Sequence, residues 1–429
     1  MLTLSIYTLI FTKTGKYYLY NSRSNFLSEI SKELYDALES RNWDSLPTEV
    51  VEELASKELI CDSKNLYDYY YSQLLRFNAL NNNRTQMDLV LVPTTACNFA
   101  CPYCFESKKN PQTIDSDTIK SLAEFIKNRE DLKHISITWY GGEPLLAFDK
   151  MKEIYSALSA DGMPEIVYQS IITNGYCFND DIIAFLINNE CHHIQITVDG
   201  LYEKHNATRC LKNNDNDTFG PIIANIDKLV GKLTKTRINI RVNINKNNYK
   251  DFIQVAKFFK ERYPGNNMIA VYPGIIREED DNKQTLCDSS FGTSEMLTLN
   301  ELLRKEGYDT SDFPKKSFRG CIMHNINDFI IGPNGEIYKC WSDVGNPDAV
   351  IGNIKHANLT NQARYIKYAI QAIPFNDECK KCHAFPICDG GCAYLRFRNM
   401  FEGGNFDLCS PYKDKNNLIN ALFSRDIKL

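Results

Sequence analysis

Short apolar runs alternate with amphipathic segments between Leu89 and about residue 275. The runs with strand character are 89–92, 135–139, 166–172, 194–198, 237–244 and 268–272. The segments between them place apolar residues at helical spacing, as in 117–128. Strands and helices that alternate with a repeat of roughly 25–45 residues are typical of a parallel sheet with outer helices. Because such crossovers are right-handed, we predict an α/β fold whose sheet curls into a partial (β/α)6 TIM-like barrel.

The first 80 residues follow a different pattern. Two runs with strand character, 2–11 and 16–20, flank a Thr14-Gly15 turn and predict a hairpin. Helical spacing then occurs over three segments, which are 26–39, 48–57 and the tyrosine-rich 67–80. We therefore predict a winged-helix-like module that ends in a linking helix.

The chain has 429 residues, which is enough for two or three domains. We divide it into the module and linking helix at 1–80, the barrel at 81–275, and a connector with a cysteine-rich domain at 276–429. The charged run 277–283 predicts a solvated loop, and 284–320 predicts a helical connector.

Charge and hydropathy exclude several classes of protein. The chain carries 49 basic and 54 acidic residues, and this net charge of −5 argues against a broad nucleic-acid surface. No stretch approaches the ~20 apolar residues of a membrane span. The apolar N-terminus lacks a basic start and a small-residue cleavage site, so it predicts a strand and not a signal peptide. We therefore expect a cytoplasmic protein that binds neither a membrane nor nucleic acid.

The fifteen cysteines are clustered along the chain. Three lie within 97–104, and seven lie within 321–409. The other five are Cys61, Cys177, Cys191, Cys210 and Cys287. An odd, clustered number of cysteines in a chain without an export signal indicates metal ligation and not disulfides. Of the scattered cysteines, we expect all but Cys287 to be buried apolar thiols.

The first cluster, Cys97-x3-Cys101-x2-Cys104, directly follows the first predicted barrel strand. Three thiolates at loop spacing suit a [4Fe–4S] cluster that keeps one iron open. A structural zinc site would usually have four ligands, and three unliganded thiols are the remaining alternative. A GGEP segment at 141–144 follows the second strand, where glycines either let the backbone approach a ligand closely or form a tight turn.

The second cluster is larger and lies toward the C-terminus. Its members are Cys321, Cys340, Cys379, Cys382, Cys388, Cys392 and Cys409. On spacing alone, one or two zinc ribbons are the main alternative to iron–sulfur clusters. Apolar neighbours such as Phe385 and Ile387 would exclude water from an iron–sulfur cluster and so tune its potential.

The cysteine spacing around Tyr103, together with GGEP at 141–144, resembles the radical S-adenosylmethionine (SAM) superfamily over residues 89–275. The resemblance implies that Cys97, Cys101 and Cys104 bind a [4Fe–4S] cluster whose open iron chelates the amino and carboxylate groups of SAM. It also implies that Tyr103 contacts SAM near the adenine, that Gly142 and Glu143 contact the methionyl amine, and that Arg209 contacts the carboxylate. Three further SAM contacts are implied by motifs of the family, which are Asn174 in a T-N-G turn and Thr197 and Asp199 in a segment like S-L-D-G. Without the resemblance, Asp199 and Arg209 would be interpreted as a turn acid and a surface base.

The later cysteines resemble the SPASM domain, which carries auxiliary iron–sulfur clusters. The resemblance implies an outer [4Fe–4S] cluster on Cys379, Cys382, Cys388 and Cys409, and an inner one on Cys321, Cys340 and Cys392. Sulfatase-maturing relatives have one more cysteine, at the position of Lys315 here. The inner cluster therefore has an open iron, a substrate ligand or a distant thiol such as Cys287. The expected total is three [4Fe–4S] clusters.

These resemblances imply a reaction. An electron from a donor such as flavodoxin or ferredoxin would enter the first cluster and cleave SAM to methionine and a 5′-deoxyadenosyl radical, which takes a hydrogen from the substrate. The N-terminal module resembles leader-peptide recognition domains, which would bind a leader by adding a strand to a sheet. We therefore expect a peptide maturase that forms a thioether, carbon–carbon or related crosslink on a ribosomally made precursor peptide.

Two alternatives remain. A sulfatase maturase would oxidise a cysteine or serine to formylglycine, and such relatives carry an aspartate where Trp341 follows Cys340 here; Asp343 lies two positions further on. A nucleic-acid-binding protein with zinc ribbons would contain zinc in place of iron and sulfide. The sequence assigns no catalytic base, precursor peptide, bond type or oligomeric state.

Overall fold

The computed structural model describes residues 1–104, 110–212, 217–276, 293–308, 321–356, 359–370, 377–388 and 390–423. The chain forms two compact units. The barrel unit consists of Asn83–Leu302 and Asn325–Ala369, and the terminal unit consists of Met1–Asn82, Leu303–His324 and Ile370–Leu429. The segment 276–429, which the sequence suggests as one domain, is thus divided between the two units.

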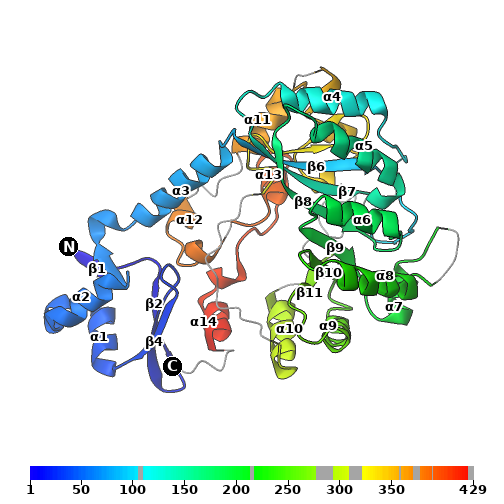
Figure 1. The fold of residues 1–429 in the computed structure, drawn as a ribbon. Coiled ribbons are helices and arrows are strands. Elements are labelled where there is room, and N and C mark those ends of the chain that lie inside the picture. The colour runs from blue at the N-terminus through cyan, green and yellow to red at the C-terminus, as the bar shows by residue number, and fades with distance from the viewer. Residues whose placement is uncertain are drawn as a thin grey trace. The chain divides into compact units, whose positions relative to one another are not determined.

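The barrel unit is built on one mixed sheet with the strand order β11-β10-β9-β8-β7-β6-β12-β13-β14 (Figure 1). Its first six strands along the chain are all parallel to their neighbours. They are β6 (Gln86–Thr94), β7 (His134–Gly141), β8 (Glu165–Thr173), β9 (His193–Thr197), β10 (Arg237–Ile244) and β11 (Ile269–Ile275). Each of the six predicted strands is present, and the expected α/β fold is confirmed.

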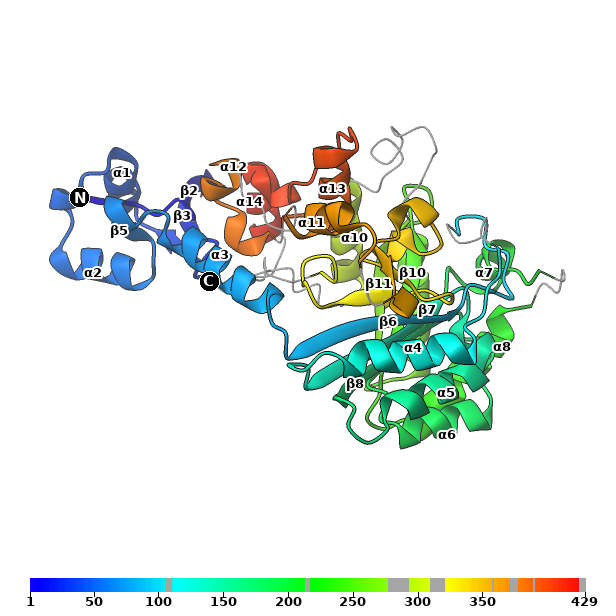
Figure 2. The same ribbon diagram turned by 90° about the horizontal axis from the view of Figure 1, so that it is seen from above.

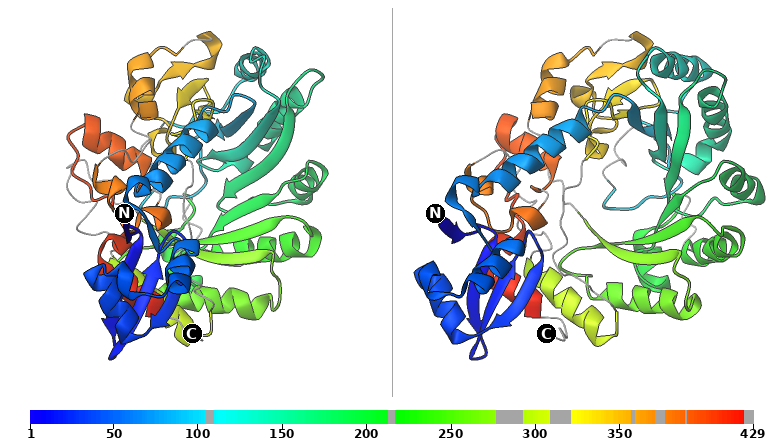
Figure 3. Two further views of the ribbon diagram at one scale, coloured as in Figure 1. Left: turned by 90° about the vertical axis from the view of Figure 1, so that its left-hand side faces the viewer. Right: turned by 60° about the vertical axis from the view of Figure 1, so that its left-hand side comes forward.

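Helices between these strands cover the outer, convex side of the curved sheet, as Figures 2 and 3 show. They are α4 (Ser116–Lys127), α5 (Phe148–Leu158), α6 (Asp180–Asn188), α7 (Tyr202–Thr208), α8 (Phe219–Lys232) and α9 (Asp251–Arg262). Strand β7 illustrates how burial differs between the two faces of the sheet. Ile135, Ile137 and Trp139 are fully buried, whereas the residues between them are half-buried. Since successive side chains of a strand point to opposite faces, one face of β7 forms the core and the other faces the barrel interior.

Three short strands that we did not predict extend the sheet beyond β6. They are β12 (Phe329–Ile331), β13 (Glu336–Tyr338) and β14 (Gly352–Asn353). β12 is parallel to β6, and β13 and β14 continue antiparallel. Two or three residues are too few to show a period-2 pattern, so hydrophobic periodicity could not reveal these strands.

The connector between barrel and C-terminal region contains α10 (Thr293–Lys305), which confirms a helix there. Another helix, α11 (Gln362–Ile370), follows the strand extension. The charged run 277–283 and most of the rest of 284–320 lie outside the described residues. Among the described helices, none has the length and hydropathy needed to span a membrane.

The terminal unit begins with a three-stranded antiparallel sheet. Its strands are β2 (Thr8–Lys13), β3 (Lys16–Asn21) and β4 (Phe26–Ile30), and a further pair joins β1 (Leu2–Leu4) to β5 (Ile60–Asp62). Its helices are α1 (Lys32–Ser40), α2 (Thr48–Ser56), α3 (Asp68–Asn81), α12 (Asp377–Lys380), α13 (Ala393–Phe401) and α14 (Lys415–Phe423). The hairpin at Thr14-Gly15 is confirmed, with φ angles of 51° and 76° at its turn.

Two N-terminal predictions need correction. The run 2–11 is not one strand, because the Ser5 amide donates to the Leu59 carbonyl and the Thr8 amide donates to Ser5, which separates β1 from β2. The first five residues of the predicted helix 26–39 form β4 instead. The helix begins only after Ser31, whose hydroxyl accepts a hydrogen bond from the Leu34 amide and caps it.

The N-terminal sheet and the end of the chain share a hydrophobic core. Leu9, Phe11, Tyr18 and Tyr20 of β2 and β3 form one buried cluster with Ala384, Ile387, Leu418 and Leu422. The other side of the sheet is covered by the cluster of Leu19, Leu38, Leu54, Leu59 and Ile60. The N-terminal module is therefore not an independent domain, and its deletion would expose the apolar face of α14.

We predict that Leu422→Ala lowers the stability of the terminal unit by about 2–5 kcal/mol, because it leaves a cavity against the N-terminal sheet. Hydrogen exchange should then increase at the amides of β2 and β3, which are far from residue 422 in sequence. Leu75→Ala is the matched control, since that side chain is 73% exposed on α3 and its loss should cost less than ~0.5 kcal/mol. Unchanged exchange in β2 and β3 would contradict the shared core.

Candidate functional site

The residues predicted to contact SAM gather at the carboxyl edge of the parallel sheet. The cysteine loop follows β6, and Gly142 and Glu143 follow β7. Asn174 follows β8, and Thr197 ends β9. Because neighbouring strands are parallel, these ends lie along one edge, where ligands bind in α/β folds.

The cysteine loop brings three thiols into one another's electrostatic range. The pKa of Cys97 is raised to about 12, mainly by burial and also by the nearby charges of Glu143, Cys101 and Cys104. Burial also raises the pKa of Cys101, whereas the Arg209 guanidinium lowers it. Three thiolates so placed repel one another, and a cationic group that binds all three would relieve this repulsion.

In the described part of the chain, no group of three or more His, Cys, Asp or Glu side chains is arranged to bind a single metal ion. An iron–sulfur cluster is larger than one ion, so the thiolates that bind it stand farther apart. Cysteine thiols are the donors that iron–sulfur clusters take, so the chemistry of Cys97, Cys101 and Cys104 fits a cluster.

Close backbone packing explains why GGEP contains glycine. A Cβ atom on Gly142 would overlap the backbone of Thr95 and Ala96, the segment that leads into the cysteine loop. The Glu143 amide donates to the Ala96 carbonyl at 2.8 Å, and the Gly142 amide donates to the Thr94 carbonyl at 3.2 Å. The segment thus fixes the start of the cysteine loop by close backbone contact. From the sequence we expected the backbone of GGEP either to approach a ligand closely or to form a tight turn.

Glu143 is fully buried and joins the turns that follow β7 and β8. Its carboxylate accepts hydrogen bonds from the Thr173 hydroxyl at 2.8 Å, the Asn174 amide at 2.7 Å and the Leu145 amide at 3.1 Å. Burial raises the pKa of Glu143, and these hydrogen bonds oppose the shift. Oε2 accepts only the Asn174 bond among the described residues, so it keeps acceptor capacity for one more donor.

A second buried polar network holds the end of the cysteine loop. The Tyr103 hydroxyl donates to Asp199, and Arg209 Nη1 donates to the same hydroxyl at 2.7 Å. Arg209 and Asp199 also form an ion pair at 3.6 Å, with side chains only 8% and 3% exposed. Arg209 Nε is buried and has no hydrogen-bond partner among the described residues. The arrangement leaves a guanidinium N–H that an anionic ligand group could accept from.

Sequence reasoning missed Asn243 of β10 as part of this network. Its amide donates to Asp199 Oδ1 at 2.8 Å, and its side chain donates to the Tyr103 hydroxyl at 3.3 Å. A polar residue in the otherwise apolar end of a buried strand was the available signal. Cys177 also lies nearer the site than expected of an apolar thiol, because Asn98 Nδ2 donates to its sulfur at 3.7 Å.

The later cysteines are described in two groups. In the terminal unit, burial raises the pKa of Cys379 to about 11, and the charges of Cys388, Cys382 and Cys409 contribute to the shift. The four thiols expected to hold the outer cluster are therefore near one another. Of the expected inner ligands, Cys321 and Cys392 belong to the terminal unit and Cys340 belongs to the barrel unit. Cys287 and Lys315 lie outside the described residues.

Comparison with known proteins identifies the family of the barrel unit. The radical SAM superfamily profile matches residues 91–282. A cysteine-type anaerobic sulfatase-maturating enzyme of Clostridium perfringens is 23% identical over 367 residues, covering 76% of this chain and 95% of the relative. The radical SAM cyclopropyl synthase TigE of Paramaledivibacter caminithermalis is 22% identical over 420 residues, covering 87% of this chain and 85% of the relative.

Solved structures share the fold. Native anSMEcpe with bound AdoMet and Cp18Cys peptide superposes with a TM-score of 0.60 at 21% identity, covering 79% of this chain and 97% of that one. Streptococcus suis SuiB bound to precursor peptide SuiA gives a TM-score of 0.50 at 15% identity, covering 92% and 96%. With its three-cysteine loop at the carboxyl edge of a six-stranded parallel sheet, the chain belongs to the radical SAM superfamily of enzymes.

Proposed function

We propose that this enzyme is a peptide maturase, which abstracts a hydrogen from a ribosomally made precursor peptide and so installs a thioether, carbon–carbon or related crosslink. The N-terminal sheet β2–β3–β4 is the observation that carries the proposal. β4 pairs only with β3 among the described strands, and its residues are half-buried or exposed, whereas three of the six residues of β2 are buried. A half-exposed edge strand can bind an extended leader peptide by strand addition.

The extent of similarity also supports a peptide substrate. TigE and SuiB cover 87% and 92% of this chain, and the sulfatase maturase and the anSMEcpe structure cover 76% and 79%. TigE is named a cyclopropyl synthase, and SuiB was solved with a precursor peptide. The chain therefore matches these peptide modifiers over more of its length.

SAM and a [4Fe–4S] cluster supply the 5′-deoxyadenosyl radical in this superfamily, and we propose that Cys97, Cys101 and Cys104 hold that cluster. The unpartnered Nε–H of Arg209 would donate to the SAM carboxylate, and Glu143 Oε2 would accept from its amine. Gly142, Asn174 and Thr197 would complete the methionyl side of the pocket, and Tyr103 and Asp199 would hold Arg209 in place.

We also propose two auxiliary clusters, for a total of three. Cys379, Cys382, Cys388 and Cys409 would hold the outer cluster, and Cys321, Cys340 and Cys392 would hold the inner one. The mutual electrostatic effect of the outer thiols supports the first set. A flavodoxin- or ferredoxin-like donor would supply the electron.

Sulfatase maturation is the second candidate, because the sulfatase maturases are relatives of this chain. Asp343 is the nearest acid to the expected position of the base. It is buried, and its carboxylate accepts a hydrogen bond from the Tyr368 hydroxyl at 2.7 Å. An aspartate so engaged is a poor base for a substrate proton, so this contact favours the peptide maturase.

We predict that the anaerobically reconstituted enzyme contains about three clusters per chain. Replacing Cys97, Cys101 and Cys104 together by Ala should remove about one third of the iron and sulfide and all SAM cleavage, because the ligand sets are separate. Cys191→Ala is the control, since this buried thiol belongs to no proposed set and its loss should leave the iron content unchanged. Iron for a single cluster, or zinc in its place, would contradict the three-cluster assignment.

We predict that Arg209→Gln and Glu143→Gln each weaken SAM binding by roughly tenfold or more, because each removes a charge-assisted contact. Glu143→Gln should also lower the melting temperature, since an amide cannot accept all three bonds that the carboxylate accepts. Equilibrium dialysis with SAM measures the affinity. Arg262→Gln, which removes the pair with Asp227 and a cation–π contact with Phe258 on an outer helix, should bind SAM normally. Wild-type affinity in both site variants would place the SAM carboxylate and amine elsewhere.

We predict different effects of proline at two neighbouring positions of β4, Ser28 and Glu29. Adjacent amides of a strand point to opposite edges, so one substitution removes a donor to β3 and the other removes a donor on the open edge. The first should lower the melting temperature. The second should leave folding and SAM cleavage intact but slow modification of a leader-bearing precursor peptide.

Glu29→Ala is the control for the loss of the exposed Lys16 ion pair, which should have little effect. If the proline variant with the wild-type melting temperature modified its peptide at the wild-type rate, the leader would not bind at β4.

A further inference from the structure

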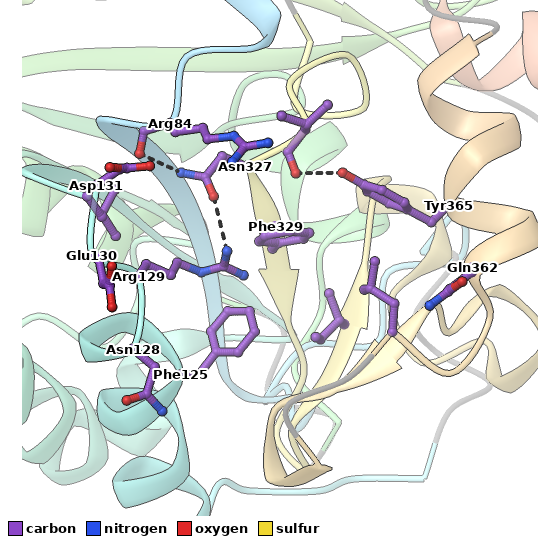
Figure 4. Close-up of a pocket in the computed structure, with 14 residues that line it drawn as sticks. Arg84, Phe125, Asn128, Arg129, Glu130, Asp131, Asn327, Phe329, Gln362 and Tyr365 are labelled. Atoms are coloured by element: carbon purple, nitrogen blue, oxygen red, sulfur yellow. Dashed lines mark hydrogen bonds between the residues drawn. The ribbon is translucent and has the colours of Figure 1, made fainter.

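A pocket of about 500 Å³ opens in the barrel unit, away from the cysteine loop (Figure 4). Arg84 precedes β6, residues 128–132 connect α4 to β7, and Asn327 precedes β12. These three strands are parallel. The pocket therefore lies at the amino edge of the sheet, opposite the carboxyl edge that carries the SAM residues.

Arg129 is the unusual group in this pocket. Its guanidinium lies over the rings of Phe125 and Phe329, at 4.4 and 5.3 Å from their centres. Its Nη1 makes one long hydrogen bond, at 3.4 Å, to Asn327, and its Nε is buried without a partner among the described residues. No described carboxylate forms an ion pair with it, and burial lowers its pKa. A desolvated cation without a counter-charge is costly, so the site would gain from an anion.

The polar neighbours of Arg129 are already engaged and keep the pocket in shape. Asn327 Nδ2 donates to the Gln86 carbonyl at 2.9 Å, so its Oδ1 faces Arg129. The Tyr365 hydroxyl donates to the Ile326 carbonyl at 2.8 Å. Figure 4 shows the Tyr365–Ile326 bond, the bond between Asn327 and Arg129, and a second bond from Asn327 Nδ2 to the Arg84 carbonyl at 3.4 Å. The pocket is therefore preformed around a guanidinium that makes one long hydrogen bond and keeps a buried Nε–H without a partner among the described residues.

The other lining residues restrict the class of ligand. Phe125, Phe329, Leu132, Ile337 and Leu359 offer apolar contact, and Glu130 and Asp131 are also part of the lining. Apolar walls favour a ligand with an aromatic or branched aliphatic body. Two acids disfavour a polyanion such as a nucleotide.

We propose that this pocket binds a small monocarboxylate with an apolar body, whose carboxylate pairs with Arg129 and whose body lies against Phe125 and Phe329. The planar guanidinium fork matches the geometry of a carboxylate, and removing both charges from water together strengthens the pair. The site is separate from the SAM site and does not depend on the peptide-maturase proposal.

Fluorine NMR with 4-fluorobenzoate as the probe tests the proposal on the full-length, cluster-loaded enzyme. We expect saturable binding to the wild type and at least tenfold weaker binding to Arg129→Gln. Arg129→Lys should be intermediate, because it keeps the charge but loses the fork. Lys127→Gln, on the exposed end of α4, is the matched control and should bind the probe as the wild type does.

Three further measurements separate a ligand site from a structural role of Arg129. 4-Fluorobenzyl alcohol, which lacks the charge, should not bind, and inorganic phosphate should compete only weakly. Since Arg129→Gln removes an uncompensated charge, its melting temperature without probe should be equal to or above that of the wild type. SAM affinity should be unchanged in every variant. Equal binding of the alcohol, equal binding of 4-fluorobenzoate by Arg129→Gln, or no saturable binding at millimolar probe would overturn the proposal.

Discussion

The buried carboxylate of Glu143 is the contact on which the geometry of the cysteine loop depends. A carboxylate removed from water is costly unless hydrogen bonds replace its solvation. Here the Thr173 hydroxyl and the amides of Leu145 and Asn174 replace it, and they come from the turns after β7 and β8. Because the Glu143 amide also holds the Ala96 carbonyl, one residue links two strand ends to the start of the loop.

The loop is held at its other positions as well. The Ala100 amide donates to the Cys210 carbonyl in the middle, and Tyr103 is bound by Asp199 and Arg209 near its end. Each of these contacts comes from the chain itself. These hydrogen bonds therefore fix the loop that carries the three thiols at its start, its middle and its end. Such preorganisation lowers the entropic cost of ligation.

The sequence predicted those parts of the structure that have a long period or a specific spacing. The six barrel strands and the radical SAM motif Cys97-x3-Cys101-x2-Cys104 belong to this class. Phe26–Ile30 was misassigned, because its pairing with β3 overrides the helical spacing of residues further on. Asn243 was marked only by its polarity in a buried strand, and the anchoring role of Glu143 had no signal in the sequence, since the contacts of both depend on which strand ends become neighbours. The Arg129 pocket could not be predicted from the sequence for the same reason, because Arg84, Arg129 and Asn327 come together only in the folded sheet.

The terminal unit connects the two features that the proposed function needs. Tyr7, directly before β2, forms a buried cluster with Tyr70, Leu74 and Phe385, and Cys379 and Cys382 pack against that cluster. Cys382 also packs against the cluster that β2 and β3 form with the end of the chain. The sheet proposed to bind the leader and the cysteines proposed to bind the outer cluster thus share side-chain contacts. Close-packed interiors transmit small displacements, because they contain few voids to absorb them. A leader that shifted β2 or β3 on binding would therefore also shift the Cys379–Cys382 segment, so the proposed leader site and the proposed outer-cluster site would be mechanically coupled.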